Sequence, residues 1–267
     1  MTSLAKSSFF SFLPSFLFQH VSAGYNFNSP MSNKLRWRLF YEYVIRSHSS
    51  CLLPIWPRNS KYPVYIRGGT TDITNFVSVF VHEEYGFISN SPRTIIDLGG
   101  SIGISSAYFA LKFPESRILV IEPDPVNYAL CLLNNRFNAN VVVENVGVWS
   151  HDIHLQERSR LYGDMSINFS PADPRTATCG YVQAYSITTL LNMFGFSEVD
   201  FLKVDIEGAE LDVFSGNAAD QWLPRVHSMS VEIHESKFPG CDFAVRSAAA
   251  RHCFSESTFG EYAVFTR

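Results

Sequence analysis

Between residues 94 and 234, short apolar runs alternate with stretches of helical periodicity. The runs predict buried strands at 94–98, 117–121, 141–144, 201–204 and 228–234. Continuous apolar runs of this length, separated mostly by helical segments, are typical of parallel strands that are covered on both faces. The chain is therefore expected to form an α/β fold with a doubly wound, mostly parallel sheet.

Helical segments and two further strands complete the predicted pattern. Helices are expected at 72–85, 103–113, 125–137, 208–214 and 243–253, with short strands at 64–67 and 263–266. Residues 151–185 lack this alternation. Their Gly, Pro, Asp and Ser content predicts an inserted loop or hairpin beside the strand ends.

The first part of the chain differs from the rest in composition. Residues 1–62 are rich in Ser, Phe, Pro and Asn, and only Leu35–Arg46 places apolar residues near one helical face. We interpret residues 1–62 as a partly irregular N-terminal appendage and residues 63–267 as the main domain. The apolar run Phe9–Phe18 is too short for a membrane helix, and it fits either a signal-peptide core or a docked N-terminal arm.

Charge is unevenly distributed over the 267 residues, whose formal net charge is −4. Residues 1–67 carry eight basic residues against one acidic residue. This basic segment is either a solvated face or a peripheral contact to a membrane or a carrier protein, and it lacks the long Lys/Arg stripe expected of a nucleic-acid partner. The five cysteines form no CxxC motif. Their spacing fits a reducing, cytoplasmic compartment, although the Phe-rich start leaves targeting open.

The segment Asp97–Gly103 (DLGGSIG) follows a predicted strand and begins a predicted helix. Its glycines permit a tight turn and a close approach of a ligand, although a plain strand–turn–helix is the alternative. Asp97 stands where a dinucleotide site holds phosphate, and a carboxylate there repels phosphate but accepts a hydrogen bond from an ammonium group. The motif favours S-adenosylmethionine, and we expect Asp97, Gly99, Ser101 and Gly103 to bind it.

Two further strand ends extend this predicted cofactor site. Glu122 follows the second strand, 25 residues after Asp97, near the spacing at which acids accept both ribose hydroxyls. NAD and S-adenosylmethionine both meet that requirement, so Glu122 alone does not choose between them. Asn145 and Val146 follow the third strand and are expected beside an adenine, with a turn role for Asn145 as the equal alternative.

Several blocks resemble the FkbM-type S-adenosylmethionine-dependent methyltransferase family. They are Arg67–Asp72, Asp97–Gly103, Ile121–Asn127, Val231–His234 and, most specifically, Phe201–Glu210 (FLKVDIEGAE). One departure is Gly100-Ser101, where the family usually has Ala-Asn. The resemblance covers about residues 64–266 and implies a Rossmann-like class I methyltransferase fold. It also implies transfer of a methyl group to a hydroxyl on a sugar or small natural product.

Candidate catalytic residues follow the fourth and fifth strands, at the edge where open α/β sheets bind ligands: Asp205, Glu207, Glu232 and His234. His234 is the predicted general base because the ordinary pKa of histidine is about 6.5. Asp205 and Glu232 would orient it or hold the acceptor, and Glu207 is the next candidate base. Asp205, Glu232 and His234 also suit Mg²⁺ or another divalent ion, but the metal-free base is favoured and no metal ligand is assigned.

Two other functions stay open at this point. A Rossmann-type NAD-dependent oxidoreductase shares the expected fold and Glu122, but Asp97 in the phosphate position counts against it. A non-catalytic domain that kept the methyltransferase fold is the second alternative, and the intact glycines and acids count against it. The expected partner is a small-molecule hydroxyl acceptor, whose identity the residue pattern does not reveal.

Overall fold

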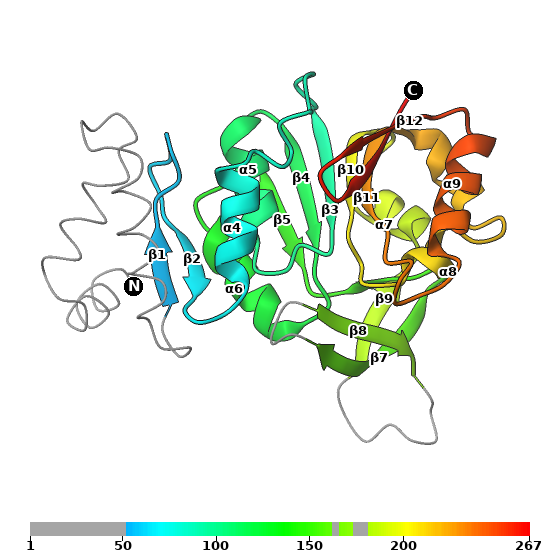
Figure 1. Ribbon diagram of the computed structural model, residues 1–267, viewed down its shortest axis with the longest axis horizontal. Helices are drawn as coiled ribbons and strands as arrows, with labels where there is room; N and C mark the ends of the chain where they lie inside the picture. The colour runs from blue at the N-terminus through cyan, green and yellow to red at the C-terminus, as the bar shows by residue number, and fades with distance from the viewer. Residues whose placement is uncertain (1–51, 162–165, 173–180) are drawn as a thin grey trace, which may run out of the picture. The chain divides into compact units, whose positions relative to one another are not determined.

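The computed structural model describes residues 52–161, 166–172 and 181–267 (Figure 1). The chain divides into two compact units, Met1–Ile73 and Thr74–Arg267. The run Phe9–Phe18 and the predicted helix Leu35–Arg46 lie outside the described residues. No helix in the described part of the chain has the length and hydropathy that crossing a membrane requires.

The described part of the first unit contains strands β1 (Leu52–Ile55) and β2 (Val64–Arg67), which pair in antiparallel fashion. The strand predicted for residues 64–67 is confirmed by β2, whereas no strand was predicted for residues 52–55. The side chain of Arg67 makes two hydrogen bonds of 2.8 Å to the Asp72 carboxylate, and both residues are buried. This ion pair joins the end of β2 to the start of helix α4 (Asp72–Phe80).

The main sheet has seven strands within the described residues, in the order β12-β13-β11-β10-β3-β4-β5. Their bounds are β3 (Thr94–Leu98), β4 (Arg117–Ile121), β5 (Val141–Glu144), β10 (Val199–Val204), β11 (Val226–Glu232), β12 (Ser255–Phe259) and β13 (Tyr262–Thr266). β13 runs antiparallel to β11 and β12, while the remaining pairs are parallel. The predicted α/β class with a mostly parallel sheet is confirmed.

Helices cover both faces of this sheet (Figure 1). One face carries α5 (Ile104–Lys112) and α6 (Pro125–Asn135), and the Phe109 ring lies 5.7 Å from the Phe201 ring of β10. The other face carries α7 (Ile187–Met193), α8 (Glu210–Phe214) and α9 (Cys241–Arg251), which pack into one large core cluster with the strands. The sheet is therefore doubly wound.

Local signals explain where the helices begin and end. At the start of α6 the Asp124 carboxylate accepts hydrogen bonds from the amides of Val126 and Asn127, and Pro125 occupies the first turn. The helix predicted for residues 72–85 ends at Phe80, because Glu83 adopts a φ of +52° and the chain then turns Tyr85 into the core. Strand β12 was not predicted, because its sequence SESTF is mostly polar and lacks an apolar run. In the structure all five of its residues are exposed.

A smaller four-stranded sheet lies within the described part of residues 147–185. It has the order β6-β9-β7-β8 and consists of β6 (Gly147–Val148), β7 (Ile153–Leu161), β8 (Ser166–Pro171) and β9 (Tyr181–Tyr185). β7 and β8 pair in antiparallel fashion, so the predicted inserted hairpin is confirmed. Figure 1 shows the carboxyl ends of β3, β4 and β5 pointing toward this sheet.

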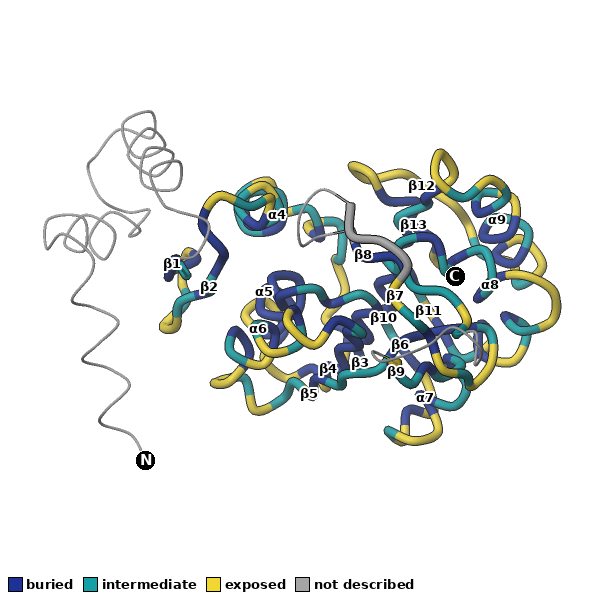
Figure 2. Tube along the Cα trace, turned by 90° about the horizontal axis from the view of Figure 1, so that it is seen from below, coloured by how far each residue is buried: buried dark blue, intermediate teal, exposed yellow. Residues whose placement is uncertain are grey.

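Strands β3, β4, β10 and β11 of the main sheet form the buried centre of the second unit (Figure 2). Two charged residues are buried among them, Asp97 with 0% and Lys203 with 3% of its surface exposed. Trp222 is 2% exposed and its ring lies 5.3 Å from that of Phe214 in an edge-on contact. Large apolar side chains such as Trp222 supply most of the free energy that stabilises such a core.

We predict that Trp222→Ala lowers the free energy of unfolding by about 3–5 kcal/mol, because it leaves a cavity that neighbouring side chains cannot fill. Phe243→Ala is the matched control, since the Phe243 side chain is 78% exposed. That control should stay within about 0.5 kcal/mol of the unsubstituted chain in urea unfolding. Equal losses in the two variants would contradict the packing described here.

Candidate functional site

A cavity of about 370 Å³ lies at the carboxyl edge of the main sheet, in the size range of small-molecule sites. Residues that follow β3, β4, β10 and β11 line one side, and Leu155, Ile167 and Phe169 of the smaller sheet line another. Six carboxylates border the cavity: Glu84, Glu122, Asp205, Glu207, Glu232 and Glu261. The cavity is therefore an acidic site with an apolar wall.

The floor of this site depends on Lys203. Its ammonium lies 3.1 Å from Asp97 Oδ1 and 3.5 Å from Asp205 Oδ2, and it donates a 2.9 Å hydrogen bond to the Gly99 carbonyl. Burial opposes the charge, but the two carboxylates outweigh it and raise the pKa of Lys203 well above its usual value. Lys203 is thus a permanent cation that ties the end of β3 to the end of β10.

Asp97 differs from its predicted position in the cofactor site. Its carboxylate accepts a 2.6 Å hydrogen bond from Ser105 Oγ and holds Lys203, and Asp97 is not among the residues that line the cavity. The ammonium group that Asp97 binds in this structure belongs to Lys203. Gly99, the next predicted residue, does line the cavity. A Cβ at Gly99 would lie 1.7 Å from the Asp205 carbonyl oxygen, so the approach of the two strand ends requires glycine.

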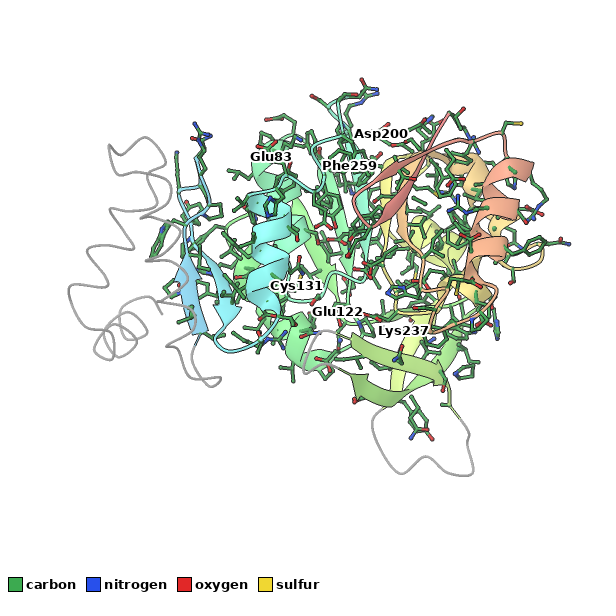
Figure 3. All side chains as sticks on the ribbon, viewed as in Figure 1. Glu83, Glu122, Cys131, Asp200, Lys237 and Phe259 are labelled. Carbon is green, nitrogen blue, oxygen red and sulfur yellow. The ribbon has the colours of Figure 1, made fainter. Side chains whose placement is uncertain are left out.

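Glu122 lies at the end of β4 and lines the cavity (Figure 3). Its two carboxylate oxygens accept hydrogen bonds from the amides of Ser101 (2.7 Å) and Asp124 (2.9 Å). Burial raises the pKa of Glu122 to about 7, although these two amides oppose the rise. Ser101 also lines the cavity, and its buried Oγ has no hydrogen-bond partner among the described residues.

The remaining predicted cofactor residues, Gly103, Asn145 and Val146, are not part of the cavity lining. Gly103 adopts a φ of +83° and packs against Cys131 and Asn135 of α6. The Asn145 amide donates to the Glu122 and Pro123 carbonyls, and Val146 packs against the main core. The wall expected from Asn145 and Val146 is formed instead by the next three residues, Gly147, Val148 and Trp149.

His234 lies two residues beyond the end of β11 and is 8% exposed. Its Nδ1 is 3.1 Å from Glu210 Oε1, and its Nε2 is 3.5 Å from Glu207 Oε2 and 3.6 Å from Glu232 Oε1. Burial opposes protonation, but the bond to Glu210 and the surrounding carboxylates raise the pKa of His234 to about 9. His234 therefore carries a proton at neutral pH, unlike the free base expected from its ordinary pKa.

The three carboxylates predicted beside His234 are brought together in the cavity. Asp205, Glu207 and Glu232 all line it. Burial, followed by the charge of Asp205, raises the pKa of Glu232 to about 8. Glu207 adopts a φ of +53° in the turn after β10, and Lys237 Nζ lies 3.2 Å from its Oε2 (Figure 3 labels Lys237). The turn thus presents Asp205 and Glu207 side by side.

Glu210 has a role that the sequence reasoning did not predict. An acid at a helix start commonly complements the helix dipole, but Glu210 is fully buried. Its carboxylate accepts hydrogen bonds from the amides of Ile206 (3.1 Å) and Gly208 (2.8 Å) while it holds His234. Lys203 is likewise not among the predicted site residues. A lysine inside an apolar strand is itself a signal, because lysine is rarely buried without a charged partner.

Comparison with known proteins assigns this chain to a family. The methyltransferase FkbM domain matches residues 97–260, which is more than half of the chain. The fold is that of a Rossmann-like methyltransferase domain. The chain belongs to the FkbM methyltransferase family.

Two curated relatives are named as methyltransferases. "Methyltransferase 1" of Beauveria bassiana (strain ARSEF 2860) is 28% identical over 172 residues, which are 54% of this chain. "Methyltransferase sdnD" of Sordaria araneosa is 29% identical over 168 residues, which are 51% of this chain. In each case the match spans 65% of the relative's own length.

Among solved structures, the methyltransferase FkbM from Methylobacillus flagellatus KT is similar with a TM-score of 0.47 and 16% identity. The match covers 72% of this chain and 48% of that one. A putative caffeoyl-CoA O-methyltransferase from Staphylococcus aureus matches with a TM-score of 0.41 and 10% identity, over 95% of this chain and 98% of that one.

We predict that Lys203→Met lowers the free energy of unfolding by about 3–5 kcal/mol, because it leaves the buried Asp97 carboxylate without its cation. The double variant Asp97→Asn/Lys203→Met should be more stable than Lys203→Met alone, since it removes the unpaired charge as well. Urea unfolding followed by circular dichroism measures both. Additive losses in the double variant would show that the two side chains are energetically independent.

Proposed function

We propose that this chain is an S-adenosylmethionine-dependent O-methyltransferase that acts on a hydroxyl of a sugar or small natural product. The observation that carries the proposal is a single cavity in an FkbM-family domain. That cavity joins Glu122, at the end of β4, to the catalytic candidates Asp205, Glu207 and Glu232. Ligands of open α/β sheets bind at this carboxyl edge.

The donor groups of the cavity suit the cofactor. Glu122 retains acceptor capacity for a ribose diol, because a carboxylate offers more lone pairs than its two amide bonds use. The Ser101 hydroxyl lies beside it and has no hydrogen-bond partner in the described part of the chain. Val148 and Trp149 supply an apolar wall for an adenine. Asp97 contributes through Lys203, which fixes the Gly99 carbonyl and Asp205. When bound, S-adenosylmethionine supplies an electrophilic methyl group on a sulfonium.

The catalytic candidates divide the remaining work between them. His234 is more than nine-tenths buried and held by Glu210, so we assign it the positioning of the neighbouring carboxylates. Glu232 lines the cavity beside His234 and is our candidate for the group that takes the hydroxyl proton. Asp205 and Glu207, on the turn after β10, are placed to hold the acceptor.

Binding and turnover test the proposed function directly. The full chain should bind S-adenosylhomocysteine in calorimetry and bind NAD weakly or not at all. Incubation with S-adenosylmethionine and a panel of small-molecule alcohols should yield a methyl ether, identified by mass spectrometry and by the NMR shift of an O-methyl group. Tight binding of NAD, or methylation at nitrogen only, would contradict the proposal.

The raised pKa of Glu122 predicts a pH dependence of cofactor binding. The ionised carboxylate is the form that accepts hydrogen bonds from a diol, and with a pKa of about 7 its ionised fraction rises about tenfold between about pH 6 and pH 8. Affinity for S-adenosylhomocysteine should rise by about the same factor over that range. Glu122→Gln should bind more weakly and lose the pH dependence in calorimetry. An unchanged pH profile in Glu122→Gln would assign the titration to another group.

The base assignment predicts that Glu232→Gln lowers kcat by about 10²–10⁴-fold with little change in cofactor affinity. Glu198→Gln is the matched control, because the Glu198 side chain is 70% exposed and is not part of the cavity lining. Initial rates and calorimetry on both variants provide the measurement. Near-full turnover of Glu232→Gln would move the base role to Glu207.

A further inference from the structure

Asp205 and Glu207 line the cavity, and His234, which is not part of its lining, lies beside them. Asp205, Glu207 and His234 each offer one oxygen or nitrogen atom, and these atoms all lie within 4.8 Å of one another. Asp205 and Glu207 come from the turn after β10, and His234 from the segment after β11. The three belong to neighbouring parallel strands, so the sheet itself holds them together.

The orientation of His234 is an independent observation that points to a ligand. Glu210 is fully buried, and its carboxylate fixes Nδ1 of the ring while two backbone amides fix the carboxylate. Nε2 is therefore directed at Glu207 and Glu232, at 3.5 and 3.6 Å, beyond the usual length of a hydrogen bond. A histidine that is held through one nitrogen by a carboxylate, with the other nitrogen directed into a polar cluster, is the arrangement of a metal ligand.

The charges around this point favour a cation. The carboxylates of Asp205, Glu207, Glu210 and Glu232 surround His234. Lys203 lies 3.5 Å from Asp205, but it also holds Asp97 at 3.1 Å. Lys237 lies 3.2 Å from Glu207 and is partly exposed. The negative charge of the carboxylates around His234 thus exceeds the positive charge that Lys203 and Lys237 supply.

We propose that Asp205, Glu207 and Nε2 of His234 bind a first-row divalent transition-metal cation, with Mn²⁺ as the best-matched ion. The ring keeps the Nδ1 proton that it donates to Glu210 and releases the Nε2 proton to solvent when the cation binds. Two carboxylate oxygens and one imidazole nitrogen form a mixed donor set that suits such an ion better than calcium, whose ligands are all oxygens. Asp205 and Glu207 line the cavity, so the cation would keep open positions toward a ligand there. This inference rests on the proposed function and deepens it, because the acceptor hydroxyl would bind the cation beside Glu232.

Binding of the ion itself is the direct test. The full chain, treated with a chelator and desalted, should bind one Mn²⁺ per chain in calorimetry, and the electron paramagnetic resonance signal of free Mn²⁺ should fall accordingly. Asp205→Asn, Glu207→Gln and His234→Gln should each weaken binding at least about tenfold. Glu198→Gln is the control: the Glu198 side chain is 70% exposed and is not part of the cavity lining, so the Mn²⁺ affinity of this variant should stay close to that of the unsubstituted chain.

Glu210→Gln separates positioning from ligation. Gln keeps a hydrogen-bond acceptor for the turn but loses the charge that orients the ring, so Mn²⁺ affinity should fall about 10–100-fold while one ion still binds. Should Glu210→Gln fail to fold, the cation site is tested by Glu207→Gln, which replaces a partly exposed ligand side chain.

The outcomes distinguish this inference from the proposed function. Absence of Mn²⁺ binding, or equal binding by the unsubstituted chain and the three ligand variants, overturns the cation site. The proposed function survives that result if S-adenosylhomocysteine still binds and methyl transfer persists in chelator. Conversely, specific Mn²⁺ binding without S-adenosylhomocysteine binding would keep the cation site and overturn the proposed function.

Discussion

The buried ion pairs of Lys203 are the interaction on which the site depends. Lys203 contacts Asp97 of β3, the Gly99 carbonyl and Asp205 at the end of β10, so a single side chain fixes the geometry of two strand ends. Burying these charges costs free energy, and pairing recovers it only when the geometry is good. A core built of apolar residues alone would be no less stable. It would not, however, hold the glycine turn and the Asp205 carboxylate in fixed positions.

The structure shows what individual residues do in the block Phe201–Glu210, which carries the family resemblance. Lys203 joins β10 to β3 through Asp97, and Asp205 is the first residue of the block that lines the cavity. Glu207 and Gly208 both have positive φ, and the glycine is required because a Cβ there would lie 2.2 Å from the Phe238 ring. Glu210 then closes the turn through two amides and orients His234 from another strand. One short stretch of chain therefore supplies four residues of the cavity lining, which are Asp205, Ile206, Glu207 and Ala209.

The sequence allowed the sheet to be predicted better than the site. β3, β4 and β5 were predicted with their observed bounds, because an apolar run between turn residues is a local signal. Contacts between distant residues are not local. The pairing of Asp97 with Lys203 joins residues that are far apart in the chain, and the proton of His234 depends on carboxylates from two elements. Asp97 and His234 were thus identified as important, whereas their buried partners Lys203 and Glu210 were missed.

The charge of the cavity bears on which ligands this domain can hold. Among the described residues that line the cavity there are six carboxylates and no Lys or Arg. A dinucleotide would bring its pyrophosphate into this field, whereas a sulfonium cofactor or a divalent cation would enter with favourable charge. The sequence analysis argued that the negative charge of Asp97 disfavours a phosphate-bearing cofactor. In the structure Lys203 neutralises Asp97, so this repulsion of phosphate comes from the six carboxylates of the cavity instead.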